Sequence, residues 1–315
     1  MSNCLFCYQP LAANEQDFHA SCSKKIFGQP TPPELPYSEE DLEPLAKKVI
    51  QSQTAVTGVQ AKLSLHITGN QKEGNERRFT IVGLWGGYLL KPPTALYPQL
   101  PEVEDVTMHL AQLAKIKTAP HCLIRLQSGN LAFVTKRIDR TKNGKLAMED
   151  MCQLTERLTE DKYHGSYEQI AKAIQRHSVT PGLDVVNFFE LVLFSFLTGN
   201  ADMHLKNFSL LEQQGLGMVL SPAYDLVNTA LVHPADEEEM ALTLNGRKKK
   251  LTKQDFVAAM NTLKLEEKQQ EMIFNKMAKA WPHWQELIDR SFMSVEFKEQ
   301  YKSLLKERMN RIKQL

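Results

Sequence analysis

The sequence lacks an excess of charge of either sign, with 38 Lys and Arg residues against 37 Asp and Glu and a formal net charge of +1. This balance excludes a protein that binds nucleic acid mainly through counterion release from a basic surface. Internal repeats and low-complexity tracts are lacking too. With 42% hydrophobic and 24% charged residues over 315 positions, the chain can bury a sizeable core, and wholesale disorder is excluded.

Long hydrophobic runs are also missing. The longest apolar stretch, Val185 to Leu197, is interrupted by Asn187, Glu190 and Ser195 and is shorter than the roughly 20 residues that span a bilayer. We therefore expect no membrane contact. The opening residues Met-Ser-Asn-Cys-Leu-Phe-Cys lack a basic region followed by an apolar core, so we expect no secretion signal and a cytoplasmic location.

Cysteine is scarce and unevenly distributed. Cys4, Cys7 and Cys22 lie near the N-terminus, whereas Cys122 and Cys152 stand alone. This distribution is unlike the even disulfide framework of a small secreted domain.

The N-terminal cysteines have the spacing of a metal site. Cys4 and Cys7 share a tight turn, and His19 and Cys22 follow a turn predicted over Gln9 to Phe18. A Cys₃His set with such short pairs suits tetrahedral zinc, and four protein ligands would make that zinc structural. The alternative is a set of reduced cysteines in a small buried turn.

The first half of the chain is predicted to be rich in strands. A proline-rich connector occupies 29–36, and Ser38 precedes an acidic helix start that we expect to run toward Ile50. One long helix is expected from Glu104. Alternation of apolar and polar residues predicts an antiparallel sheet with strands at 62–68, 79–82, 88–90, 122–126 and 131–134.

The second half is predicted to be mostly helical. Arg247 to Lys250 follow Asn245-Gly246, which predicts a basic turn on a solvated face, with an acidic or phosphate-bearing partner as the alternative. Helical periodicity predicts helices at 149–154, 167–176, 185–197, 255–264, 265–280, 281–292 and 295–313.

A polar loop directly after the buried helix carries Asp202 and Asn207, the spacing of the protein-kinase catalytic loop. Alone, such a pair is often a turn or cap. Two short strands, 208–211 and 218–220, follow and lead to Asp225, where kinases place a second metal-binding carboxylate. Two carboxylates and an amide supply the oxygen ligands that Mg²⁺ prefers.

A cationic anchor for phosphates is predicted at Lys91, which ends an apolar strand, with Glu104 at the start of the next helix as its partner. The alternative is a solvated strand-end lysine. The segment from Thr57 to Lys62 holds one glycine, Gly58, and is therefore neither a Walker loop nor a three-glycine kinase loop.

Taken in order, these motifs resemble the HipA-type serine/threonine kinases, the toxins of bacterial toxin–antitoxin modules, over roughly residues 50 to 315. The resemblance implies an α+β, two-lobed, protein-kinase-like fold, with an antiparallel β-rich N-lobe, a mostly helical C-lobe and a small N-terminal Cys/His knuckle. We place the knuckle at 1–28, the N-lobe at 29–140 and the C-lobe at 141–315. The segments that carry the resemblance are Thr57-Gly58-Val59-Gln60-Ala61-Lys62, Leu90-Lys91-Pro92-Pro93, Glu149-Asp150-Met151-Cys152-Gln153, Gly199 to Ser209 and Pro222-Ala223-Tyr224-Asp225.

The resemblance also implies roles for single residues. Asp202 is the expected catalytic base, Asn207 and Asp225 hold Mg²⁺, and Lys91 contacts the ATP phosphates. His204 is a nucleotide-site residue and a candidate general base, although such a histidine is more often structural and bonds backbone carbonyls. The further residues expected at the nucleotide are Thr57, Gly58, Val59, Gln60, Lys62, Lys206 and, on the linker beside the adenine, Lys136, Arg137 and Ile138.

The chain departs from the longest members of this family in two ways. Only about fifty residues precede the glycine-bearing segment, so it is similar to the short HipT-type kinases, which implies a separate small HipS-like protein and a helix-turn-helix antitoxin as partners. DNA would be contacted only through the antitoxin. Ala55 stands where the family has its self-phosphorylated serine, which leaves Thr57, or failing that Thr54, as acceptor unless both only cap backbone amides.

The leading hypothesis is a kinase that phosphorylates a serine or threonine of a cytoplasmic protein and slows growth. The resemblance implies an aminoacyl-tRNA synthetase, for Glu or Trp, as the target. One alternative is a nucleotide-binding pseudokinase that acts as an interaction module with the antitoxin. Another is a small-molecule kinase whose acidic pocket would be Asp236 to Glu239, a run that otherwise reads as a solvated loop.

Overall fold

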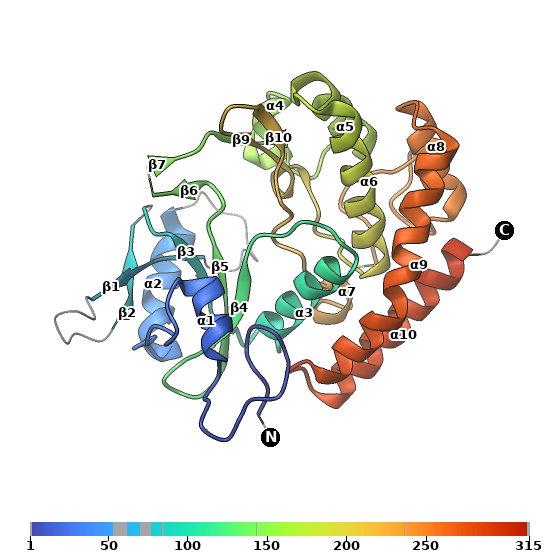
Figure 1. Cartoon of the computed structure of the whole chain (residues 1–315). Coiled ribbons are helices and arrows are strands. Elements are labelled where there is room, and N and C mark those ends of the chain that lie inside the picture. Colours follow the sequence, from blue (N-terminus) through green and yellow to red (C-terminus); the bar gives the residue numbers. More distant parts are fainter. Residues whose placement is uncertain are drawn as a thin grey trace. The chain divides into compact units, whose positions relative to one another are not determined.

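The computed structural model describes residues 2–52, 62–69, 77–83, 85–142, 144–235 and 237–313 (Figure 1). The chain forms two compact units. The N-terminal unit comprises 1–105, 119–138 and 290–292, and the C-terminal unit comprises 106–118, 139–289 and 293–315. The predicted acceptors Thr54 and Thr57 and the segment from Gly58 to Gln60 lie outside the described residues, as does Asp236.

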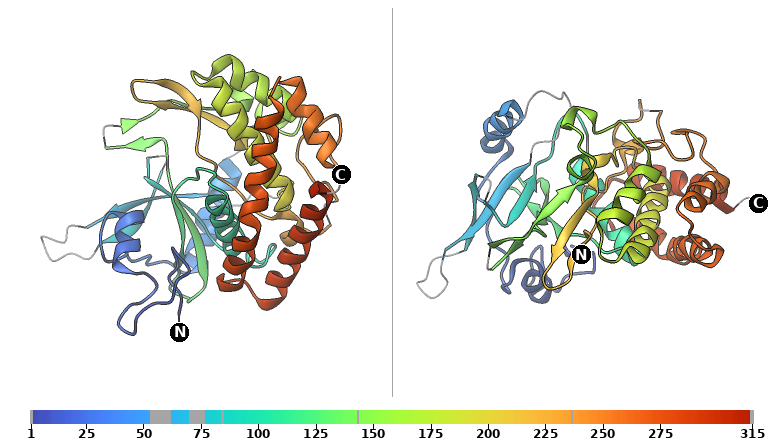
Figure 2. Two further views of the ribbon diagram at one scale, coloured as in Figure 1. Left: turned by 45° about the vertical axis from the view of Figure 1, so that its right-hand side comes forward. Right: turned by 90° about the horizontal axis from the view of Figure 1, so that it is seen from above.

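A five-stranded antiparallel sheet organises the N-terminal unit (Figure 2). Its order is β2-β1-β3-β5-β4, and every neighbouring pair is antiparallel, as the sequence predicted. Alternation places Leu63 and Leu65 in the core while His66 is exposed. The strands are β1 (Leu63–Thr68), β2 (Arg78–Val82), β3 (Tyr88–Lys91), β4 (His121–Arg125) and β5 (Leu131–Lys136).

Helices α1 (Ala20–Phe27) and α2 (Glu39–Ser52) precede this sheet, and α3 (Leu100–Leu113) begins within the same unit. The start of α2 at Glu39 confirms the prediction, because the Ser38 amide donates to Asp41 Oδ2 at 2.8 Å. The prediction that α3 starts at Glu104 was wrong by one turn. Pro101 is tolerated in a first helical turn, so the helix already begins at Leu100.

The N-terminal knuckle and the sheet share one hydrophobic core. Leu5, Phe18 and Ile26 are buried in the same cluster as Leu65 of β1 and Leu123 of β4. The core continues through edge-to-face aromatic contacts, a geometry that ring quadrupoles favour. The knuckle is thus part of the packing of this unit.

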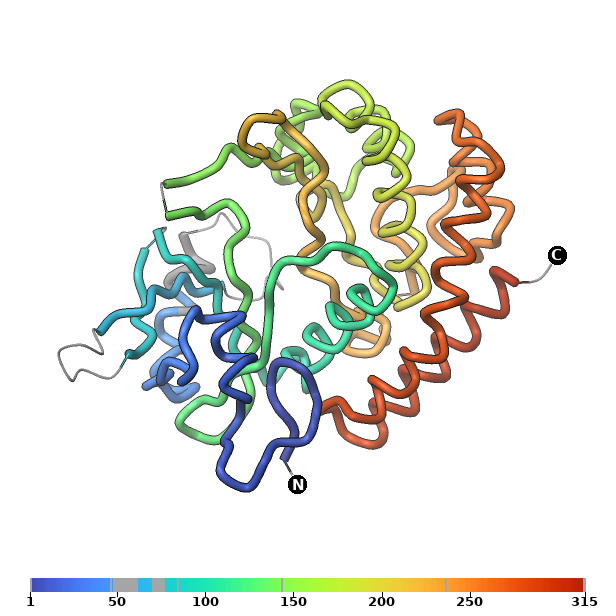
Figure 3. Tube along the Cα trace, in the orientation of Figure 1, coloured from blue at the N-terminus to red at the C-terminus, as the bar shows by residue number. Residues whose placement is uncertain are grey.

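The C-terminal unit is mostly helical, and Figure 3 traces its long helices α9 and α10 running antiparallel beside each other. Its strands form a small three-stranded antiparallel sheet, in the order β10-β9-β8, and a separate two-stranded pair, β6 and β7. Its elements are β6 (Arg140–Thr141), β7 (Gly144–Lys145), β8 (Met148–Asp150), α4 (Met151–Leu154), η2 (Thr159–Asp161), α5 (Tyr167–His177), α6 (Pro181–Leu197), η3 (Leu205–Asn207), β9 (Ser209–Gln213), β10 (Gly217–Leu220), α7 (Thr229–Val232), α8 (Lys253–Thr262), α9 (Glu267–Arg290) and α10 (Val295–Lys313).

Helix α6 is the buried centre of this unit. It begins at Pro181, four residues before the predicted start, because proline fits the first turn of a helix. The Arg308 guanidinium of α10 donates to the Phe196 carbonyl at 2.5 Å, and Trp284 of α9 contacts Phe194 edge to face. Within the described part of the chain, no helix is long and apolar enough to cross a membrane.

Two helix predictions in this unit were wrong. Residues 149–154 are not one helix, because 148–150 pair with β9 as a strand and Asp150 then caps α4 in a capping box with Gln153. The helices predicted at 265–280 and 281–292 are one helix, α9, with Pro282 inside it. The buried Trp284, whose Nε1 donates to the Leu110 carbonyl at 2.9 Å, holds the helix beyond the proline.

Candidate functional site

The loop that follows α6 is fixed by a short polar network. Gly199 has φ of +72°, and a Cβ atom there would lie 2.7 Å from Asn228 Oδ1, so glycine is required at this turn. Thr229 Oγ1 accepts from the Ala201 amide at 2.8 Å and donates to the Gly199 carbonyl at 3.1 Å. The backbone ahead of Asp202 is therefore held in place.

Asp202 and Asn207 are joined within this loop. Asn207 is buried, and its Nδ2 donates to the main-chain carbonyl of Asp202 at 2.8 Å. The Asp202 amide in turn donates to Asn200 Oδ1 at 3.1 Å, while the Asp202 side chain is 47% exposed. The loop thus leaves the Asp202 carboxylate partly exposed to solvent, and it commits the amide nitrogen of Asn207 to a backbone carbonyl. The amide oxygen of Asn207 is not used in this bond.

Tyr163 is a residue of this site that the sequence did not reveal. Its hydroxyl donates to Asp202 Oδ1 at 2.6 Å, and its ring stands edge-on to the His204 ring at 5.0 Å. Tyr163 is 39 positions from Asp202, and no spacing rule connects the two residues. Its only sequence signal is an aromatic residue in a polar segment.

His204 is a buried residue close to the partly exposed Asp202 carboxylate. Burial lowers the pKa of His204 to about 4, against the opposing charge of Asp202, so the ring is neutral near pH 7. Its Nε2 is 4.0 Å from Asp202 Oδ1. His204 Nδ1 has no hydrogen-bond partner among the described residues, so this nitrogen makes no bond to a backbone carbonyl there.

Lys206 is held by a carboxylate from another motif. Its Nζ donates to Asp150 Oδ2 at 2.8 Å, and Asp150 also caps α4. The sequence alone does not predict a site residue in the segment Glu149 to Gln153. In the structure, Asp150 orients Lys206 through this bond.

Asp225 follows the β9–β10 hairpin in a rare backbone conformation. Its φ is 57°, in the left-handed region that costs a non-glycine residue about 1–3 kcal/mol and that clusters at functional sites. The Tyr224 hydroxyl donates to the Lys206 carbonyl at 3.0 Å and lies 2.5 Å from Ser209 Oγ. Burial raises the pKa of Tyr224 well above its usual value, so it remains a donor and ties this segment to the Asp202 loop.

In the N-terminal unit, the structure pairs Lys91 with Glu104. Lys91 Nζ bonds Glu104 Oε1 in a short contact, and the two residues are 4% and 1% exposed. The Phe133 ring lies under the ammonium, 5.4 Å from its centroid. Lys91 is therefore a buried, oriented cation, and the alternative of a solvated strand-end lysine was wrong.

The other residues predicted at the nucleotide in this unit lie at the ends of strands. Lys62 is exposed just before β1. Lys136 ends β5 and is exposed, whereas Arg137 and Ile138 follow it and are half-buried. The Arg137 amide donates to the Gly87 carbonyl at 2.9 Å, which fixes the backbone of this segment.

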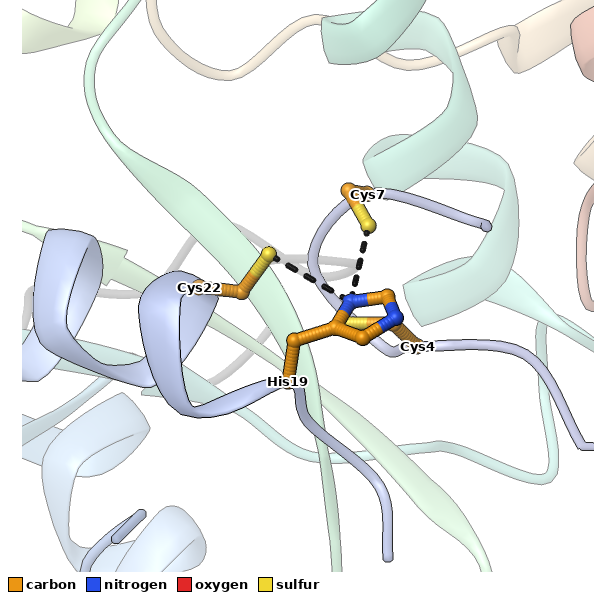
Figure 4. A group of neighbouring side chains, drawn as sticks. All are labelled: Cys4, Cys7, His19 and Cys22. Atoms are coloured by element: carbon orange, nitrogen blue, oxygen red, sulfur yellow. Dashed lines mark hydrogen bonds between the residues drawn. The ribbon is translucent and has the colours of Figure 1, made fainter. Parts of the chain in front are cut away.

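Cys4, Cys7, His19 and Cys22 come together in the N-terminal unit (Figure 4). His19 Nδ1 lies 3.4 Å from Cys7 Sγ and 3.7 Å from Cys22 Sγ. Burial would raise the pKa of the Cys4 thiol, but backbone hydrogen bonds from Phe6, His19 and Cys7 bring it below its usual value. Burial and the charge of Cys4 raise the pKa of Cys22 to about 12.

The acidic segment 237–239 forms ion pairs within the C-terminal unit, and two of these pairs are with the basic segment 247–250. Glu237 bonds Lys249 and Glu238 bonds Lys248, each at 3.1 Å. Glu239 accepts from Arg311 at 2.6 Å. The partner of the basic turn is thus an acidic segment of the chain itself.

Two solved structures share the fold of this chain. The HipA protein from the Shewanella oneidensis MR-1 toxin–antitoxin system, solved with HipB and operator DNA, matches with a TM-score of 0.67 and 21% identity, covering 85% of this chain and 70% of that one. The Helicobacter pylori proinflammatory kinase CtkA matches with a TM-score of 0.54 and 18% identity, covering 71% and 87%. The fold is therefore kinase-like, as predicted.

Sequence comparison places the chain in a family. The family described as HipA-like C-terminal domain matches residues 54–284, and the chain belongs to this family. A kinase candidate of Haemophilus influenzae is 29% identical over 250 residues, 73% of this chain and 69% of that protein. The kinase candidate Y4dM of Sinorhizobium fredii is 32% identical over 207 residues, 62% of this chain. The aligned part is 49% of Y4dM, so the chain spans about half the length of that relative.

Proposed function

We propose that this chain is an ATP-dependent serine/threonine protein kinase. The observation that carries the proposal is the loop in which buried Asn207 bonds the Asp202 carbonyl while the Asp202 carboxylate stays exposed. Asp225, in its left-handed conformation after a hairpin, supplies the further carboxylate that kinase chemistry requires. Membership of the HipA-like family and the kinase-named relatives support the same reading.

The proposed reaction gives each of these residues a role. Asp202 accepts the proton of a serine or threonine hydroxyl as that oxygen bonds the γ-phosphorus and the bond from the γ-phosphorus to the β–γ bridging oxygen breaks, releasing ADP. Lys91, oriented by Glu104, binds the phosphates as a fixed cation. Lys206, held by Asp150, offers a second cation within the Asp202 loop. The protein thus contributes positioning and electrostatic stabilisation.

The donor set near Asp202 fits magnesium. Asn207 uses its nitrogen for the Asp202 carbonyl, so its oxygen is the ligand that remains, and Asp225 adds a carboxylate. Both are hard oxygen donors of the kind Mg²⁺ takes. Bound magnesium would neutralise the charge that develops on the transferred phosphoryl group.

The biological role we propose is that of a toxin in a toxin–antitoxin module. The Shewanella HipA was solved with HipB and operator DNA, which supports a helix-turn-helix antitoxin as partner and DNA contact through that partner. We further propose that it is a HipT-type kinase that acts with a separate HipS-like protein. The target class we propose is an aminoacyl-tRNA synthetase. The pairing of Glu237 to Glu239 with Lys and Arg supports a protein substrate over a cationic small molecule.

Regulation by autophosphorylation is a further part of the proposal. Thr57, with Thr54 as the second choice, is the acceptor next to the predicted nucleotide segment. A phosphate there carries about −1.5 to −2 charges and would repel the phosphates of ATP.

Labelling in a lysate tests the proposed activity. Purified protein, Asp202→Asn and a matched surface variant, Asp289→Asn, are incubated with γ-labelled ATP and Mg²⁺ in a bacterial lysate, and labelled sites are identified by mass spectrometry. We expect serine or threonine labelling by the wild type and Asp289→Asn, and loss of at least about 100-fold in Asp202→Asn. Equal labelling by Asp202→Asn overturns the assignment. ATP binding without labelling by any of them favours the pseudokinase.

A further inference from the structure

We propose that Cys4, Cys7, His19 and Cys22 form a structural zinc site that anchors the N-terminal knuckle to the sheet of its unit. Their donor atoms all lie within 4.8 Å of one another. They come from a tight turn, from the residue before α1 and from the first turn of α1 (Figure 4). This site is separate from the residues proposed to transfer phosphate.

The spacing of the donors matches tetrahedral zinc. Zinc bonds of about 2.3 Å to sulfur and about 2.05 Å to nitrogen, set at the tetrahedral angle, hold the two donors about 3.6 Å apart. The observed distances from His19 Nδ1 are 3.4 Å to Cys7 Sγ and 3.7 Å to Cys22 Sγ. The cluster is therefore already shaped to take the ion without rearrangement of the backbone.

The orientation of the histidine is that of a metal ligand. His19 Nε2 lies 3.1 Å from the Pro10 carbonyl, which can only accept, so Nε2 carries the proton. The unprotonated Nδ1 then points at the sulfurs. Metal-binding histidines are commonly oriented in this way, with the other ring nitrogen donating to a carbonyl or carboxylate.

The composition of the set selects zinc and a structural role. Three thiols and one imidazole are soft and intermediate donors that suit Zn²⁺ and do not suit Mg²⁺ or Ca²⁺. All five cysteines of the chain are described and carry free thiols, so no disulfide competes for these sulfurs. Four protein ligands close a tetrahedral site and leave no position for substrate.

The knuckle is bonded to strand β4 at several points. The Leu123 amide of β4 donates to the Leu5 carbonyl, between the first two cysteines, at 3.1 Å. The Leu5 amide donates to the Asp17 carbonyl at 2.7 Å, and the Asp17 carboxylate accepts from Arg125 at 2.8 Å. A metal that closes the turn therefore fixes the edge strand of the sheet.

The same turn reaches the helix that carries Glu104. Buried Tyr8, directly after Cys7, donates its hydroxyl to Asp105 Oδ2 at 2.6 Å. Asp105 also bonds His121 Nδ1 of β4 through its other oxygen, at 2.8 Å. Because Asp105 follows Glu104, the zinc site stabilises the backbone that positions Glu104, the partner of Lys91.

Metal analysis of the full-length, tag-free protein tests the site. We expect about one zinc per chain in the wild type and in Cys152→Ser, a matched control in the C-terminal unit, and less than about a tenth of that in Cys7→Ser or Cys22→Ser. Zinc-free protein that gives no tetrahedral thiolate spectrum with Co²⁺ overturns the proposal. So does an equal zinc content in all variants, or iron in place of zinc.

A second measurement needs no variant and so does not depend on whether a mutant folds. Zinc released from the wild type is followed with a chromogenic chelator while a mercurial titrates the thiols. We expect zinc to leave as the cluster thiols react. We also expect the zinc-free protein to lose hydrogen-exchange protection in β4 at least about tenfold. Unchanged β4 protection after zinc release overturns the anchoring role. Neither readout depends on kinase activity.

Discussion

The Tyr163 hydroxyl donates a hydrogen bond to Oδ1 of Asp202 at 2.6 Å. An acceptor hydroxyl of a substrate would need to make the same O–H to carboxylate bond before it could transfer its proton. Tyr163 is 40% exposed, so its side chain can be displaced at modest cost. In this structure the tyrosine therefore occupies the place that the proposed reaction reserves for substrate.

Replacing Tyr163 by phenylalanine removes that competing bond and keeps the ring against His204. Hydrogen bonds to charged groups contribute about 1.5–3 kcal/mol, and the exposure of both side chains to solvent reduces this contribution. We therefore expect Tyr163→Phe to raise kcat/KM for a protein or peptide acceptor about 2- to 10-fold. The measurement is initial-rate kinetics at saturating ATP. A lower kcat at unchanged KM would instead mean that Tyr163 positions Asp202.

The buried pair of Lys91 and Glu104 predicts different effects on stability and on activity. Lys91→Met leaves the Glu104 carboxylate buried without its cation, which costs about 3–5 kcal/mol. In the double variant Lys91→Met/Glu104→Leu both charges are gone, and we expect most of the stability to return. Both variants should lose phosphoryl transfer, since neither holds the phosphate anchor.

Calorimetry and the labelling assay together check this pair. The expected order of unfolding temperatures is wild type and double variant above the single variant. Substantial phosphoryl transfer by the double variant would show that Lys91 has only a structural role.

Much of the fold could be predicted because local patterns determine it. Alternation in Leu63–Thr68 and capping at Ser38 each act over a few residues, and the structure confirms the strand and the helix start that they predict. The border between β8 and α4 could not be predicted in the same way. The sequence of residues 149–154 favours a helix, but residues 148–150 pair with β9 as a strand. Asp150 then caps the shorter helix α4.

Short sequence motifs indicate some residues of the candidate site, whereas others are found only through tertiary contacts. Asp202, Asn207 and Asp225 stand out by spacing, and the structure shows the bond within the loop and the left-handed backbone that the spacing could not reveal. Tyr163 and Asp150 come from elements distant in sequence from their partners. Nothing in a linear pattern distinguishes them from other polar residues.

Glu239 gives a prediction for acid pH. Burial alone would raise the pKa of its carboxyl, but hydrogen bonds from Arg311 and from the Leu251 amide bring that pKa below its usual value. A carboxyl with a lowered folded pKa contributes stability that is present above its unfolded pKa and is lost as pH falls through the folded pKa. We expect this loss below about pH 4.3, the ordinary glutamate pKa.

Glu239→Gln should therefore reduce the stability of the C-terminal unit by about 1–3 kcal/mol at pH 7 and by much less near pH 3. Urea unfolding followed by the fluorescence of Trp281 and Trp284, both in α9, measures this difference at each pH. Glu237→Gln is the matched control, because Glu237 is 85% exposed and its pairing with Lys249 is worth little in water. A difference between Glu239→Gln and wild type that stays constant from pH 7 to pH 3 would show that packing, and not the charge of Glu239, holds Arg311 of α10 in place.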